Sequence, residues 1–495
     1  MIVERLADRL RARERITRLR ARAPWLFARR VRIAAMVVAV LVTIGWSRWA
    51  FDALVNRQEP RLFPDSAVYL QTAALPTELD HLHYPKPFTV PAVYRQVDAN
   101  PERIVALQRE LAFASWWLFG LTLFATLRRT RARALALVIA VGFVLAPLRL
   151  GWTATILSES ITDSLMALVL AAALGLSLAA TRLRRGRRRT AACAALAAAV
   201  AILGGAWIFS RDSNAIAALV MVGFAAIAWR PHRTVGSRAW GLSLAAVVVV
   251  LSLLSIRSAG VTPSTPTDIG WNRDWQPEAL PRAALPMINN LFHRVLTDPE
   301  AVAFFRDHGM PWSDELAGFA GYWAVDHESR FLKDPTFVPV LRWLRDHGTS
   351  TWALWLLEHP LDRADEVIAA QWSLLGDDAL WGYMPRRWRP VWRDHGVADF
   401  VRHVPTRHFF ILLLIVAAPL MVRGARAPVR GIAGCVIAGA LVAIPAAYYG
   451  DAMEVERHCY GSAQQLVIGL LLLALARADR ARPLPEPQAD AIVAS

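Results

Sequence analysis

Four short stretches of the chain carry acidic and basic side chains close together, and each lies next to a long apolar run. A carboxylate can take a proton from a hydroxyl, and the planar fork of an arginine binds phosphate oxygens in pairs. Side chains of these types suit a group transfer in which a phosphate departs. The stretches contain Asp65 and Tyr69; Glu159 and Asp163; Arg211 and Asp212; and Asp451, Glu454, Arg457 and His458.

Three of these residues also have a purely structural interpretation. Asp65 could cap a helix in "SAVYLQTAAL" (66–75), since aspartate is a preferred N-cap residue. Glu159 could only favour a helix N-terminus, and Arg211 could be a snorkelling membrane anchor. Ionisable groups at the edge of a bilayer are costly unless they are paired or functional. Because all four stretches are expected on one face of the membrane, we interpret them as one interfacial site.

The elements that must position these residues are membrane-spanning helices. The chain has 495 residues and is 55% hydrophobic, which is too apolar for a soluble domain of this size. Apolar runs of about 17 to 25 residues mark transmembrane helices. We therefore predict an all-α polytopic membrane protein with about ten transmembrane helices. The predicted spans are 33–54, 108–127, 133–149, 157–181, 190–208, 214–229, 239–256, 408–422, 430–448 and 463–477.

Arginine-rich segments set the orientation of these spans. The net charge of +16 comes mainly from arginines beside apolar runs, so membrane topology explains the charge better than nucleic-acid binding does. When ten spans are threaded, all six basic segments fall on one side. Both termini are then cytoplasmic, and the four polar stretches face outward from a bacterial plasma membrane. The basic segments are 1–32, 128–133, 182–189, 230–238, 423–430 and 477–482.

This topology divides the chain into five parts. Two outer segments are large, and the second reads mainly as helices, so we expect a mainly helical extracytoplasmic domain there. Its tryptophans could anchor helices at the membrane surface or stack on sugar rings, and we favour anchoring for most of them. The parts are a basic segment 1–32; a seven-span core 33–256 with first outer loop 55–107; a Trp-rich outer domain 257–407; three spans in 408–477; and a tail 478–495.

The tetrapeptide "RDHG" occurs three times in the second outer segment, at 306–309, 345–348 and 393–396. A metal site built from His308, His347 and His395 is one interpretation. Helix termination is the better one, because each copy places arginine and histidine in a last turn and glycine at a left-handed cap.

Taken together, the motifs resemble the GT-C superfamily of integral membrane glycosyltransferases, which take sugars from polyprenyl-phosphate carriers. Asp65 in "FPDSAVYLQTA" is similar to the acidic motif that follows the first span in that family. "YPKPFTVPAVYRQ" (84–96), "LSESITDSLMAL", "SRDSNA" and "VERHCYGSAQQLVIGLLLL" resemble the family's outer-loop and span-start motifs, with His458 where tyrosine is common. This chain has one aspartate where metal-dependent members often have paired acids, so the metal requirement stays open, with a divalent cation as candidate cofactor.

The resemblance implies transfer of a sugar from a polyprenyl-phosphate donor to an outer glycan, lipid or protein acceptor, with inversion expected from a single base. Asp65 would be the base, and Arg457 and Arg211, with Lys86, would hold the lipid phosphate. The other expected substrate-binding residues are Tyr69, Glu159, Asp163, Asp212, Glu454 and His458.

Three other classes of function remain as alternatives. The first is a membrane transporter or lipid flippase, which would need polar groups or broken helices near the bilayer midplane and often shows repeated halves. The second is a membrane acyltransferase, for which His458 would be the candidate histidine. A non-catalytic assembly protein is the third, and it would tolerate loss of charge in all four stretches.

Overall fold

The computed structural model describes residues 31, 33–56, 58–75, 86–184, 186–228, 235–260, 283–326, 328–370 and 428–479. In these ranges the chain is helical, and the single β-type contact is an isolated bridge between Arg61 and Thr155. The predicted all-helical class is therefore confirmed for the described residues. The predicted span 408–422 and the third "RDHG" copy lie outside them.

Among the described residues, six helices are long and apolar enough to cross a membrane, which is consistent with a helical membrane protein. The first, Ile33–Val55, belongs to a separate unit, and the other five belong to the unit that begins at Gln58. These five are α7 (Glu159–Arg182), α8 (Arg187–Ile208), Leu242–Gly260 within α10 (Val235–Gly260), Val429–Gly450 within α22 (Pro428–Gly450), and α23 (Val455–Ala478).

The predicted number of ten spans is not confirmed. The expected span 108–127 lies in α4 (Pro101–Thr126), whose first ten residues include Glu102, Arg103, Arg109 and Glu110. The expected spans 133–149 and 214–229 correspond to shorter helices, α5 (Thr130–Val144) and α9 (Asp212–Ala228). The last predicted span begins earlier than expected, because α23 already starts at Val455.

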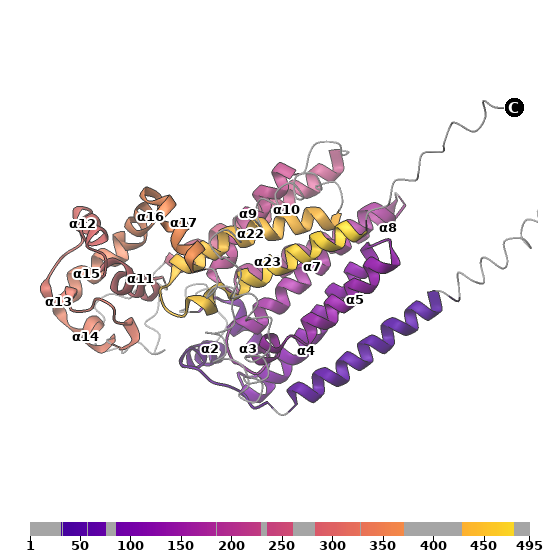
Figure 1. Ribbon diagram of the computed structural model, residues 1–495, viewed down its shortest axis with the longest axis horizontal. Coiled ribbons are helices and arrows are strands. Elements are labelled where there is room, and N and C mark those ends of the chain that lie inside the picture. The colour runs from indigo at the N-terminus through magenta and orange to yellow at the C-terminus, as the bar shows by residue number, and fades with distance from the viewer. Residues whose placement is uncertain are drawn as a thin grey trace, which may run out of the picture. The chain divides into compact units, whose positions relative to one another are not determined.

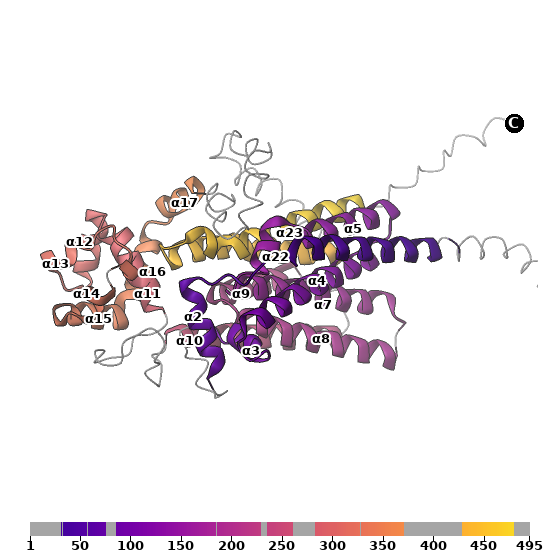
Figure 2. The same cartoon turned by 90° about the horizontal axis from the view of Figure 1, so that it is seen from below.

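The long helices of the unit that begins at Gln58 pack side by side around α7 (Figure 1). α7 contacts α4 and α8, α9 contacts α22, and α22 runs against α23 along much of its length. The first turns of α7 are buried from Glu159 to Ala167, so its polar N-terminal end is covered by protein. Three short helices, α2 (Pro64–Ala74), α3 (Thr89–Arg95) and α6 (Pro147–Trp152), lie near this end, as Figure 2 shows for α2 and α3.

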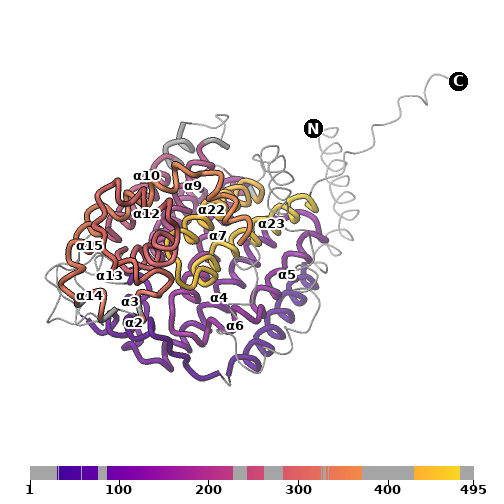
Figure 3. Tube along the Cα trace, turned by 60° about the vertical axis from the view of Figure 1, so that its left-hand side comes forward, coloured from indigo at the N-terminus to yellow at the C-terminus, as the bar shows by residue number. Residues whose placement is uncertain are grey.

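The described part of the predicted second outer segment, within 283–370, forms short helices with an aromatic core. Phe292, Phe319, Phe331 and Phe337 pack against one another with ring centroids 4.8 to 5.3 Å apart. In Figure 3 this orange group lies beside the yellow end of α22, which α11 and α17 contact. The helices are α11 (Ala284–Asn290), α12 (Pro299–Asp307), α13 (Asp314–Ala317), α14 (Glu328–Lys333), α15 (Val338–Trp343), α16 (Thr349–Glu358) and α17 (Pro360–Ala369).

Three tryptophans of this domain have a different role from the predicted membrane anchoring. Trp343, Trp352 and Trp355 are buried in the aromatic core, with at most 7% of each residue exposed. The Trp352 indole also donates a hydrogen bond to the Tyr449 carbonyl at the end of α22. The anchoring interpretation is therefore wrong for these three residues, which stabilise the domain and its junction with α22.

The two described "RDHG" copies have different structures. In the first, Gly309 adopts φ +85°, and the Met310 N–H bonds to the Phe305 carbonyl, so the predicted helix cap is confirmed. In the second, Leu344–Gly348 is a π-helical turn that runs directly into α16, so the predicted cap is wrong there. Gly348 instead allows close packing, because a Cβ at this position would lie 3.1 Å from Leu344 and 3.4 Å from Met287.

Candidate functional site

The start of the first outer loop is held against the segment that leads into α7. Arg61 exchanges backbone hydrogen bonds with Ala154 and Ile156, and the Ser66 hydroxyl donates to the Ile156 carbonyl at 2.7 Å. Pro64 is the first residue of α2, where its fixed φ suits a helix start and its missing N–H is not needed. The N-cap residue is Phe63, so Asp65 is not the cap and its carboxylate is available for other contacts.

The Asp65 carboxylate lies between two cations that come from distant parts of the chain. Its Oδ1 is 2.8 Å from Lys86 Nζ, which precedes α3, and its Oδ2 is 2.9 Å from Arg457 Nη2, in the first turn of α23. Burial alone would raise the pKa of Asp65, but the charges and hydrogen bonds of Lys86 and Arg457 outweigh burial. They hold the pKa well below its usual value of 3.8, so Asp65 is ionised at neutral pH.

Arg457 also contacts a second carboxylate. Its Nη2 is 2.6 Å from Glu454 Oε2, and only 8% of the Arg457 side chain is exposed. Glu454 is the N-cap of α23 and has φ 50° and ψ 40°, a left-handed conformation that is strained for a residue with a Cβ. This backbone geometry lets the chain turn from α22 into α23 while the two carboxylates orient one guanidinium.

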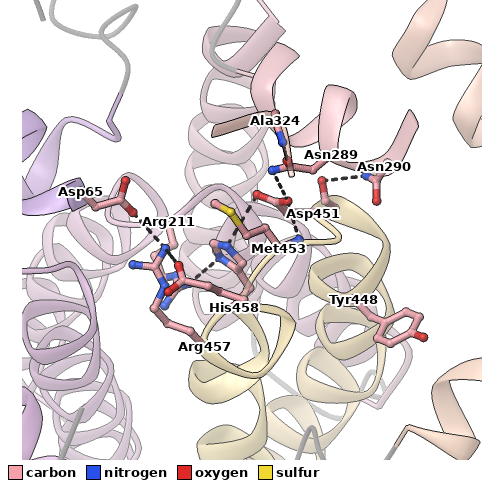
Figure 4. Close-up of polar contacts among 12 residues, drawn as sticks. Asp65, Arg211, Asn289, Asn290, Ala324, Tyr448, Asp451, Met453, Arg457 and His458 are labelled. Carbon is pink, nitrogen blue, oxygen red and sulfur yellow. Dashed lines mark hydrogen bonds and ion pairs between the residues drawn. The ribbon is translucent and has the colours of Figure 1, made fainter. Parts of the chain in front are cut away.

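A second line of contacts begins at α7. Arg211 Nη1 donates to Glu159 Oε1 at 3.1 Å. Arg211 Nη2 is 3.1 Å from His458 Nδ1 (Figure 4). On the other side of the ring, His458 Nε2 is 3.7 Å from Asp451 Oδ2. Only 9% of Arg211 is exposed, and its guanidinium contacts Glu159 and His458. Arg211 is therefore buried and is not a snorkelling anchor. Glu159 begins α7, as the structural alternative expected, but it also carries this buried ion pair.

Glu159 has one oxygen with no partner. Its Oε2 is buried and has no hydrogen-bond donor in the part of the chain that the structure describes. The Glu159 side chain is 1% exposed, so its charge depends on the protein for compensation. A buried carboxylate oxygen without a donor is a place where a ligand hydroxyl can be accepted.

Asp163 joins a different cluster from the one predicted. Its Oδ2 accepts hydrogen bonds from Arg149 Nε at 3.2 Å and from the Tyr460 hydroxyl at 3.1 Å. The Arg149 guanidinium lies 3.7 Å from the centre of the Trp116 ring, and both side chains of the ion pair are at least 96% buried. Asp163 therefore holds α6, α7 and α23 together, although it shares a helical face with Glu159.

Tyr69 and Asp212 are placed at the edges of the cluster. Tyr69 is buried, and its ring lies 5.3 Å from Lys86 Nζ. Burial raises the pKa of Tyr69, so its hydroxyl stays protonated at neutral pH. Asp212 is the first residue of α9, where a carboxylate favours the helix N-terminus. The structure thus brings Asp65, Lys86, Glu454 and Arg457 together, and places Glu159, Arg211 and His458 in the adjoining line.

Sequence reasoning named Asp451 but missed Asn289, Asn290 and Arg294, which connect this cluster to the outer domain. Asp451 Oδ1 accepts hydrogen bonds from Asn289 Nδ2 at 3.0 Å and from the Met453 N–H at 2.9 Å. Asn290 donates to the Tyr449 and Gly450 carbonyls, and Arg294 donates to the Tyr448 carbonyl. The only signal in the sequence was the pair of asparagines at 289–290, which is weak because asparagine is common in loops.

The donor set around Asp65 does not fit a divalent cation. Both Asp65 oxygens accept from cationic side chains, whereas Mg²⁺ and Mn²⁺ need carboxylate oxygens that are free to bind the ion. Within the described ranges, no group of three or more histidine, cysteine or acidic residues is arranged to hold a metal ion.

A scan against protein-family models finds no match, and comparisons with curated proteins and with solved structures find no significant match either.

Proposed function

We propose that this membrane protein is a glycosyltransferase that moves a sugar from a polyprenyl-phosphate carrier to an extracytoplasmic acceptor. The observation that carries the proposal is the Asp65 carboxylate, which is held between Lys86, before α3, and Arg457, in the first turn of α23. The two cations come from different elements and meet at a single anionic group. A phosphate is an anion of the same kind, with more oxygens to share between them.

In the proposed reaction, the lipid phosphate binds to Lys86 and Arg457. An acceptor hydroxyl oxygen then attacks the anomeric carbon of the sugar, and the bond from that carbon to the phosphate oxygen breaks. The hydroxyl proton passes to Asp65, and the electron pair leaves with the phosphate, where the cations stabilise it. One attack on the face opposite the phosphate would invert the anomeric carbon.

The charge arrangement explains how a carboxylate with a low pKa can serve as the base. Without substrate, Lys86 and Arg457 both stabilise the ionised form of Asp65. When a phosphate shares these cations, their hold on Asp65 weakens and the phosphate adds a negative charge nearby. Both effects raise the pKa of Asp65, which makes it a stronger base once the donor is bound.

Glu159 gives the proposal a contact for the transferred sugar. Its Oε1 is taken by Arg211, and its buried Oε2 has no donor among the described residues. A sugar hydroxyl would complete that hydrogen bond. Asp163, which was also expected to bind hydroxyls, is instead occupied by Arg149 and Tyr460.

The test is a turnover assay on purified protein in nanodiscs with a panel of decaprenyl- and undecaprenyl-phosphate sugars and envelope acceptors. The wild type should transfer at least one sugar, and Asp65→Asn should reduce transfer about 10²- to 10⁴-fold while the protein stays folded. Arg103→Ala is the matched control, because Arg103 forms an exposed ion pair with Asp98 and should retain full activity. Full transfer by Asp65→Asn would show that Asp65 is not the base. Carrier translocation without transfer would favour a lipid flippase.

A further inference from the structure

A continuous line of polar contacts joins the outer domain to the candidate site (Figure 4). The Ala324 N–H donates to Asn289 Oδ1 at 3.0 Å, and Asn289 Nδ2 donates to Asp451 Oδ1. The other Asp451 oxygen faces His458, whose ring contacts Arg211. The line therefore runs from a buried backbone amide of the outer domain to a cation of the site.

Two neighbours of His458 favour the same tautomer of its ring. Arg211 is always a donor, so in this arrangement His458 Nδ1 accepts from it. In the neutral ring the proton then sits on Nε2, which faces Asp451 Oδ2 at 3.7 Å. An ionised Asp451 favours this tautomer, because a carboxylate attracts an N–H and repels a lone pair.

Asp451 contacts the outer domain with one carboxylate oxygen and His458 with the other. One oxygen accepts from Asn289 in α11 and from the Met453 backbone, and the other faces the histidine. Asn289 is fully buried, and its own oxygen is held by Ala324. A shift in the position of α11 would therefore move the Asp451 carboxylate, which orients His458.

We propose that Asp451 is a positioning residue that fixes the tautomer of His458, and through it the orientation of Arg211, while anchoring α11 of the outer domain. The inference deepens the proposed function and rests on it only for its activity readout. Through this carboxylate, the contact that holds the outer domain also sets the geometry of a cation expected beside the lipid phosphate.

The variant Asp451→Asn tests the tautomer directly. The oxygen of the introduced amide can keep the bonds from Asn289 and Met453, which leaves its NH₂ group facing His458. That group donates to Nε2, so we expect the ring proton to move to Nδ1 and the Arg211 N–H to lose its acceptor on His458. The imidazole ¹⁵N spectrum of labelled protein in nanodiscs, assigned with His458→Asn, should change from an Nε2–H to an Nδ1–H pattern.

Two controls separate positioning from a general structural effect. Glu456→Gln removes the same charge from the first turn of α23 and should leave the His458 spectrum unchanged. His458→Asn keeps an acceptor oxygen for Arg211 but has no tautomers. In that background, Asp451→Asn should cause no further loss of activity, although alone it should reduce transfer at least tenfold.

The outcomes distinguish this inference from the proposed function. An Nε2–H signal that persists in Asp451→Asn would overturn the inference, whatever the activity. A tautomer change in a protein with no transferase activity would support the inference and refute the proposed function. Should Asp451→Asn not fold, lowering the pH of the wild type through about 6 neutralises the same carboxylate. The charged and titratable groups that face Asp451 are Arg457, Arg294 and His458. At the lower pH, the His458 tautomer should change from Nε2–H to Nδ1–H, as in the variant.

Discussion

The substitution Asp65→Asn separates two roles that a carboxylate in this position could have. In the resting structure, Asp65 occupies Lys86 and Arg457 at 2.8 and 2.9 Å. If those cations bind the lipid phosphate, Asp65 competes with the substrate for them. Removing its charge should then strengthen phosphate binding while it abolishes proton abstraction, so affinity and turnover should change in opposite directions.

The magnitude follows from Coulomb's law. A unit charge about 6 Å from a bound phosphate contributes about 332/(20 × 6), or roughly 3 kcal/mol, at an effective dielectric constant of 20. The Asp65 side chain is 34% exposed, so solvent screening reduces this by about half. A difference of about 1.4 kcal/mol is tenfold in affinity. We therefore expect Asp65→Asn to bind polyprenyl phosphate about tenfold more tightly than the wild type.

The assay is titration of protein in nanodiscs with polyprenyl phosphate that carries no sugar, which removes catalysis from the measurement. Asp98→Asn is the matched control, since Asp98 forms an exposed pair with Arg103 and its loss should leave affinity unchanged. Weaker binding by Asp65→Asn would refute the reasoning. It would mean that the carboxylate holds the two cations in place and does not compete with the phosphate.

Three further predictions concern stability. Arg149→Met should destabilise the protein by about 3 to 5 kcal/mol, because it leaves the Asp163 carboxylate buried without its cation. The double variant Arg149→Met/Asp163→Leu should recover much of that loss, as measured by thermal unfolding. Burial raises the pKa of Asp451 from 3.8 to about 6, so the folded state binds that proton more tightly than the unfolded chain. The free energy of unfolding should therefore fall by up to about 3 kcal/mol as the pH rises from 3.8 to about 6. The variant Asp451→Asn should flatten that part of the stability–pH curve. Gly469→Ala should lower the Tm and reduce the free energy of unfolding by about 1 to 3 kcal/mol, because the added Cβ would lie 2.5 Å from Ile437 Cγ1. Gly461→Ala is the control, because a Cβ there would meet open space.

The parts of the site that could be predicted from sequence are those that follow from membrane topology. Threading the spans by their flanking arginines put Asp65 and Arg457 on one face of the membrane, and the structure joins them although they are 392 residues apart. The same reasoning put Glu159 near Arg211, and these two form a buried pair. Topology assigns a face of the membrane, so it predicts neighbours well when few charged groups occupy that face.

The parts that could not be predicted depend on packing. Glu159 and Asp163 share a helical face, yet Asp163 pairs with Arg149, which comes from a helix too short to recognise by its periodicity. The contact between Asn289 and Asp451 joins the outer domain to a loop 162 residues later, and no local pattern specifies it.

The "RDHG" copies show that one tetrapeptide can have two structures. Pro311 follows soon after the first copy and stops the helix, whereas "TSTWALWLLE" (349–358) continues it after the second. The residues that follow the motif therefore decide between a cap and a continuous helix.

The most direct test of the central claim is native mass spectrometry of lipid binding by the wild type and by Arg457→Ala, both in nanodiscs that contain polyprenyl-phosphate sugar. Arg457 lies between Asp65 and Glu454 and is the cation expected to hold the phosphate most closely. We predict that the wild type retains the lipid and that Arg457→Ala binds it at least tenfold more weakly, as expected for the loss of a charge-assisted contact of about 1.5 to 3 kcal/mol. Equal retention by both proteins, or none by the wild type, would contradict a phosphate site at Arg457.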